Sequence, residues 1–234
     1  MELNFRKQVE QLLNKYKREM TEALGKVKEI ETSTPQSGQI YYSDHDKAQL
    51  IRDIKAELQK GDAEYNKQLN TIILKAKDDV QSATIRKPSD YQNMLNNALN
   101  QINMIGDKLT DQAAYDLVKP FFGDYETMHN LHSVVSNMHG KEGLNTTTRT
   151  LGWFDSMVST LDQIAAGTKF FFKGGQDMAI GVNYALGSDM LIGMAEELDQ
   201  MGKKMDDLTK FKFEEAEESI DESIKEKMLG KDGE

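Results

Sequence analysis

The sequence contains no cysteine, only 3 prolines among its 234 residues, and no uncharged apolar run long enough to span a bilayer. Without cysteine the chain forms no disulfides, has no thiolate nucleophile and builds no cysteine-based zinc site. Because proline interrupts helices, so few prolines favour long helices. A spanning helix needs about 20 consecutive apolar residues, and the mean hydropathy of −0.64 is that of a polar chain.

Several functional motifs are also missing. The sequence has no Gly-x-Gly-x-x-Gly or Gly-x-x-x-x-Gly-Lys-Ser/Thr loop to cradle phosphates, and no Gly-x-Ser-x-Gly turn to present a nucleophilic serine. Residues 1–7 carry charges of both signs and lack the apolar stretch of a secretory signal. We therefore expect a protein that is not an enzyme, uses no cofactor and is cytoplasmic when it is made.

The residues that are present favour helices. Hydrophobic residues make up 38% and charged residues 29% of the chain, and apolar side chains recur at steps of three and four. We predict an all-α fold, an elongated helical bundle that starts with a long amphipathic helix and ends with an acidic amphipathic helix.

Charge limits the partners. Lys and Arg total 29 and Asp and Glu total 39, which gives a net charge of −10. Residues 206–234 contain eleven acidic and five basic side chains, a net of −6. Such an acidic chain repels phosphate backbones, so we expect protein partners and no direct contact with nucleic acid.

Breaker residues divide the chain into four predicted segments. Residues 1–34 form an N-terminal arm, 35–87 a helical hairpin, 88–205 a helical core and 206–234 an acidic tail. Within the second segment the pair Gly61 and Asp62 resembles a helix stop followed by a new N-cap, so a turn is predicted there.

The N-terminal arm carries one apolar stripe that fits heptad a and d positions over about three repeats. Two interpretations remain open: the stripe packs against other helices of the same chain, or it pairs with a second copy. The second predicts a homo-oligomer, and its self-association residues are Val9, Leu13, Tyr16, Met20, Val27 and Ile30.

The acidic tail also keeps a weak apolar stripe. It is either a solvated helix face or disordered end, or a contact for a basic partner surface. In the second case the partner-binding residues are Phe213, Ile220, Ile224 and Met228.

Histidine and carboxylate side chains gather in one predicted helix. Glu126 and His129 have the i,i+3 spacing of carboxylate-bridged metal bundles, and His132 follows one turn later. A second Glu-x-x-His is missing, and Glu126 lies far from the apolar face of the helix. We therefore expect no metal, and a small helical metalloenzyme is only the third hypothesis for function.

Residues 170–195 are unusually apolar and contain several glycines. Glycines at this spacing allow close helix packing, but the segment also resembles the hydrophobic hairpins of pore-forming proteins. The alternative function is thus a helical membrane-active or exported effector.

Two stretches resemble a known class of proteins. The asparagine-rich segment 91–105 and the amphipathic end 213–228 are similar in style to small structural and assembly proteins of bacteriophages and prophages of Gram-positive bacteria. The resemblance implies a non-enzymatic, self-associating virion or scaffold-like component, associated with the virion.

Overall fold

The computed structural model describes residues 3–34, 42–138, 144–173 and 187–207. These residues form helices and contain no β-strand, so the predicted all-α fold is confirmed. The α-helices are α1 (Phe5–Thr32), α2 (Asp44–Gln81), α3 (Tyr91–Ile105), α4 (Asp111–Val118), α5 (Tyr125–Met138), α6 (Asn145–Leu151), α7 (Trp153–Phe171) and a last helix over residues 187–207. Two short 3-10 helices, Gly106–Lys108 and Lys119–Phe121, follow α3 and α4.

The chain divides into two compact units. The hairpin unit spans residues 4–77 and 159–199, and the short-helix unit spans 78–158 together with both ends of the chain. The boundary falls inside α2 and α7, so the units do not follow the four segments predicted from breaker residues.

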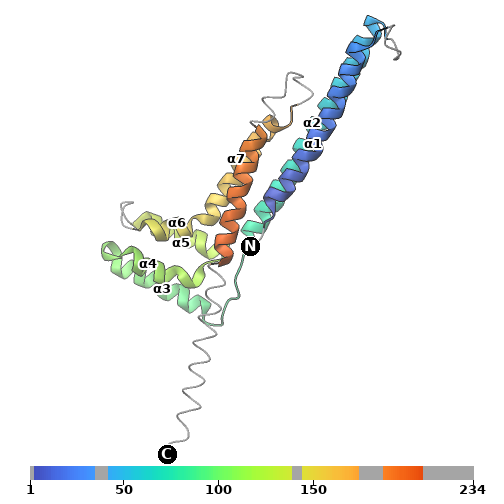
Figure 1. The fold of residues 1–234 in the computed structure, drawn as a ribbon. Helices are drawn as coiled ribbons and strands as arrows, with labels where there is room; N and C mark the ends of the chain where they lie inside the picture. Colours follow the sequence, from blue (N-terminus) through green and yellow to red (C-terminus); the bar gives the residue numbers. More distant parts are fainter. Residues whose placement is uncertain (1–2, 35–41, 139–143, 174–186, 208–234) are drawn as a thin grey trace, which may run out of the picture. The chain divides into compact units, whose positions relative to one another are not determined.

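Helices α1 and α2 run side by side in opposite directions within the hairpin unit (Figure 1). The Tyr16 hydroxyl donates a 2.7 Å hydrogen bond to Asp62, and at the other end of the pair Lys47 Nζ donates to the Ser33 carbonyl at 2.8 Å. Lys47 therefore places a positive charge at the C-terminus of α1, where helix carbonyls have no partner of their own. Ser43 caps α2, since its Oγ accepts from the Asp46 backbone N–H at 3.2 Å.

The predicted turn at Gly61 is wrong, because α2 is one continuous helix of 38 residues. Glycine inside a helix costs about 1 kcal/mol, but this cost is offset by packing. Asp62 is buried beside Tyr16, and further along α2 the side chains of Tyr65 and Leu69 are 3% and 0% exposed. The predicted hairpin within residues 35–87 is thus replaced by the pair α1 and α2.

The first turn of α1 meets the last helix of the same unit. The backbone N–H groups of Phe5 and Arg6 donate to the Asp199 carboxylate at 3.0 and 3.2 Å. The N-cap residue Asn4 makes no side-chain cap bond. Asp199 therefore supplies the acceptor that the first N–H groups of a helix require.

Helix α7 extends along α2 and ends beside Tyr65. Lys77 pairs with Asp162 at 2.7 Å, and Asn66 donates to the Phe172 carbonyl at 3.3 Å. The Phe172 ring lies 5.5 Å from the ring of Tyr65. The two helices are antiparallel, since later residues of α7 contact earlier residues of α2. Helix α7 therefore ends beside Tyr65, near the middle of α2.

The short-helix unit packs around aromatic and long aliphatic side chains. Helix α6 lies against α4 and α5. Fully buried side chains of this unit include Ile102, Phe121, Phe122, Met128, Leu131, Leu151, Phe154 and Met157.

Candidate functional site

The apolar stripe of α1 is covered by the chain itself. All six side chains predicted for self-association are at most 9% exposed. The prediction that they form an open docking seam is therefore wrong, and the alternative of packing within one chain holds. These six buried side chains are Val9, Leu13, Tyr16, Met20, Val27 and Ile30.

An open groove lies beside that stripe, between residues 16–26 of α1 and residues 50–65 of α2, with a volume of about 380 Å³. It is about 22 Å long, from fifteen helical steps of 1.5 Å. Its floor is made by Tyr16, Met20, Ala23, Leu50, Ile54, Leu58, Gly61 and Tyr65, and its rim by Glu19, Glu22, Lys26, Asp53 and Glu57.

The floor of the groove is only partly covered. Leu50, Ile54 and Leu58 are of intermediate exposure, whereas Leu69 and Ile73 further along the same helix are at most 1% exposed. The difference follows from the number of neighbours. Helix α7 ends beside Tyr65, so among the described residues of this unit only α1 packs along the first half of α2.

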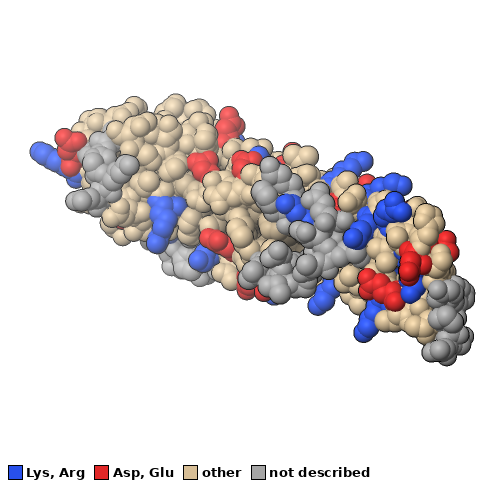
Figure 2. Space-filling model, turned by 90° about the horizontal axis from the view of Figure 1, so that it is seen from above, with Lys and Arg blue, Asp and Glu red and all other residues tan. Residues whose placement is uncertain are grey.

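Charge around the groove is unbalanced. Its rim has four carboxylates and one ammonium group, a net of −3. On the face of the molecule seen in Figure 2, acidic and basic side chains are interspersed and neither sign covers a continuous area.

The two histidines of the predicted metal cluster share a partner in the short-helix unit. Asp155, at the start of α7, accepts from Nδ1 of His129 at 2.7 Å and from Nδ1 of His132 at 2.8 Å. Both contacts form together when each ring carries its proton on Nδ1. Glu126 is exposed and takes no part. The arrangement ties α5 to α7.

This cluster is built for packing. A Cβ on Gly152 would lie 2.9 Å from Nε2 of His132, so a glycine is needed for the ring to lie against the junction of α6 and α7. The two rings contact different oxygens of the Asp155 carboxylate. No group of three or more His, Asp or Glu side chains that could hold a metal ion occurs in the described part of the chain.

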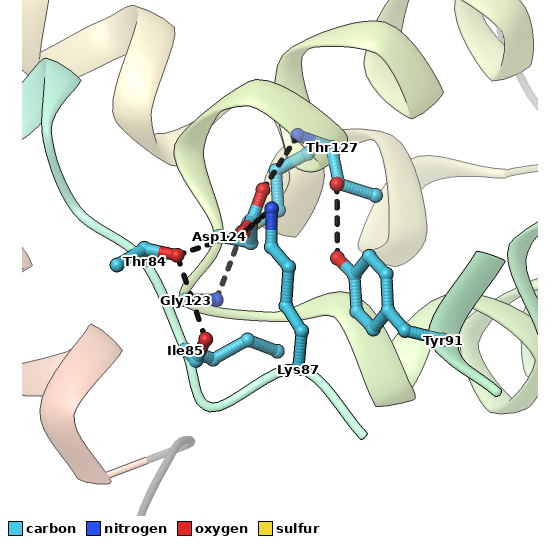
Figure 3. A network of polar contacts seen from close by, with 8 residues as sticks. Thr84, Ile85, Lys87, Tyr91, Gly123, Asp124 and Thr127 are labelled. Carbon is cyan, nitrogen blue, oxygen red and sulfur yellow. Dashed lines mark hydrogen bonds and ion pairs between the residues drawn. The ribbon is translucent and has the colours of Figure 1, made fainter. Parts of the chain in front are cut away.

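A second polar network fixes the start of α5 (Figure 3). One oxygen of Asp124 accepts from the Thr127 backbone N–H at 3.0 Å, and the other takes Lys87 Nζ at 2.8 Å and the Thr84 hydroxyl at 3.2 Å. The Tyr91 hydroxyl donates to Thr127 at 2.9 Å. The network thereby holds the connection between α2 and α3 against the N-terminus of α5.

Asp124 is charged in this network. Burial by itself raises the pKa of its carboxyl, but the hydrogen bonds from Lys87 and Thr127 outweigh burial and hold that pKa below its usual value. Its side chain is 2% exposed. Since Asp124 lies directly before α5, it is also the N-cap acceptor that this helix needs.

Asp111 likewise accepts hydrogen bonds at the N-terminus of a helix, here α6. Its carboxylate accepts from the backbone N–H groups of Thr146 and Thr147 at 3.0 and 2.9 Å and from the Thr147 hydroxyl at 2.7 Å. These bonds join the first turn of α4 to the first turn of α6. The buried carboxylate of Asp124 and the partly exposed carboxylate of Asp111 thus both join helices of this unit.

Two sequence predictions lie partly or wholly outside the described residues. The partner-binding residues Phe213, Ile220, Ile224 and Met228 belong to this group, as does the middle half of the apolar segment 170–195, residues 174–186. Among the helices that the structure describes, none combines the length and the apolar character that crossing a membrane requires.

Comparison with known proteins identified no relative of this chain. No protein-family model, curated protein or solved structure matches it. The site must therefore be judged from its own geometry.

Sequence reasoning missed the groove and Asp155. The groove floor on α2 was visible as a helical face at Leu50, Ile54 and Leu58, but the pattern does not show that α7 stops short of it. Asp155 lies 26 residues from His129 in sequence, so spacing within one helix carries no signal for their contact.

Proposed function

We propose that this chain is a non-enzymatic structural or assembly protein that holds a helix of another protein in the groove between α1 and α2. The single observation that carries the proposal is the apolar floor at Leu50, Ile54 and Leu58, whose side chains α1 leaves partly exposed. Completing the burial of such side chains stabilises a complex by about 1 kcal/mol each. A third helix would finish a packing arrangement that two helices leave incomplete.

The proposal keeps the assembly role that the resemblance to phage structural proteins implies, including association with the virion. It places the contact in the groove, since the stripe of α1 is buried.

Gly61 offers a selective way to block the groove. It lines the groove, and a Cβ added there meets no atom within 4 Å. Gly25 of α1 has equally open space but does not line the groove. Gly61→Leu therefore fills the groove while improving helix propensity, and Gly25→Leu is the matched control.

The test is a fluorescence polarisation titration of the full chain with a labelled amphipathic peptide of about 15 residues, leucine on one face and glutamine on the other. We expect saturable binding to wild type and to Gly25→Leu, and at least tenfold weaker binding to Gly61→Leu. No binding to wild type, or equal binding to both variants, contradicts the proposed function.

A further inference from the structure

We infer that the helix held in the groove is basic, with Lys or Arg on both sides of its apolar stripe. This inference rests on the proposed function and adds the chemistry of the partner. Its basis is the position of the rim charges: Glu19, Glu22 and the one cation, Lys26, line the α1 side, and Asp53 and Glu57 line the α2 side. A helix lying on the floor meets carboxylates at both edges.

Lysine and arginine suit these edges physically. Their aliphatic stems extend the apolar contact while their charged ends reach outward to the rim. Because the rim is exposed to solvent, the pairing sets specificity and salt dependence more than affinity. The partner is thus distinguished from other amphipathic helices chiefly by its charge.

Other occupants fit the charges less well. A second copy would bring its own four rim carboxylates against these four. The chain's residues 206–234 have eleven acidic and five basic side chains. The segment 174–186, which follows the end of α7 in sequence, contains Asp177 and no Lys or Arg.

The experiment repeats the polarisation titration with two further peptides that keep the leucine face and carry either lysine or glutamate on the polar face. The groove variant is Glu22→Lys, Asp53→Lys and Glu57→Lys combined. The control makes the same number of charge reversals at exposed residues away from the groove, namely Asp78→Lys, Asp79→Lys and Asp90→Lys. Circular dichroism checks that each variant keeps its helix content.

We expect the lysine peptide to bind wild type at least tenfold more tightly than the glutamate peptide at low salt, with a smaller difference at high salt. The groove variant should lose this preference, and the control should keep it. Equal affinity for the two peptides overturns the inference. If that binding is still abolished by Gly61→Leu, the proposed function stands. If no peptide binds, both the proposed function and the inference of a basic partner are contradicted.

Two further experiments test the other occupants, a second copy of the chain and the chain's own segment 174–186. Sedimentation velocity that shows a dimer of wild type, dispersed by Gly61→Leu, would put a second copy in the groove and overturn the inference. Combined Met178→Ser and Ile180→Ser substitutions should leave the affinity for the lysine peptide unchanged. A tighter affinity would mean that the chain's own segment 174–186 competes for the groove, and this outcome also overturns the inference.

Discussion

Asp124 shows how one buried carboxylate joins two parts of the short-helix unit. It takes the N-cap bond of α5 through one oxygen and the Lys87 ammonium through the other. An asparagine at this position keeps an acceptor for Thr127 but loses the charge that attracts Lys87. The two roles can therefore be separated by a conservative substitution.

Asp124→Asn should lower the free energy of unfolding at neutral pH by about 1–2 kcal/mol, since Lys87 is partly exposed and its pairing is screened. The pKa of Asp124 is lower in the folded protein than its ordinary value. Its ionisation thus stabilises the fold above the unfolded pKa of about 4, and this contribution is lost as pH falls through the folded pKa.

Denaturant titrations of both proteins across a pH series check this expectation. The difference between wild type and Asp124→Asn should shrink as the solution is acidified below about pH 4. A difference that stays constant or grows with acid would show that the charge of Asp124 does not stabilise the fold.

Residue patterns predicted which face of α1 is buried but not which helix buries it. The six stripe positions of α1 are apolar at helical spacing, and all are buried. Periodicity identifies the face that is covered but carries no information on whether the covering helix belongs to the same chain. Here the covering contacts come from the same chain, as Asp62 and Tyr65 of α2 at Tyr16 show.

Helix α2 illustrates where local propensity and tertiary packing disagree. Gly61 followed by Asp62 has the local features of a helix end, yet the helix continues through both residues. Gly61 adopts no left-handed backbone conformation, and open space surrounds its missing Cβ. The glycine is therefore not required for the fold of this helix.

Gly61→Ala should raise the free energy of unfolding by about 0.5–1 kcal/mol, because alanine loses less backbone entropy in a helix. Gly25→Ala, in equally open space on α1, should give a gain of the same size. Thermal melts followed by circular dichroism measure both. A loss of stability at Gly61 alone would mean that α2 bends or ends there.

Helix α6 is the element that the local sequence does not predict. Its seven residues, Asn145–Leu151, contain three consecutive threonines and have little intrinsic helix preference. It is held instead by the Asp111 carboxylate, which accepts from the first N–H groups of the helix, and by packing against α4 and α5. Both contributions come from residues distant in sequence, so no local pattern predicts them.

At the scale of the whole molecule, the division into units could not be predicted because it does not follow the breakers. Pro88 and Pro120 lie within the short-helix unit, while the boundaries cross the interiors of α2 and α7. The helical class was predictable from composition and periodicity. The groove depends on where α7 ends along α2, and this relation exists only in the folded hairpin unit.

The most direct test of the central claim, that the groove between α1 and α2 holds a basic helix, is hydrogen–deuterium exchange of the full chain with and without the leucine–lysine peptide. The account predicts slower amide exchange confined to residues 16–26 and 50–65, the two walls of the groove. Unchanged exchange in these residues under saturating peptide, or protection found only in the short-helix unit, would contradict it.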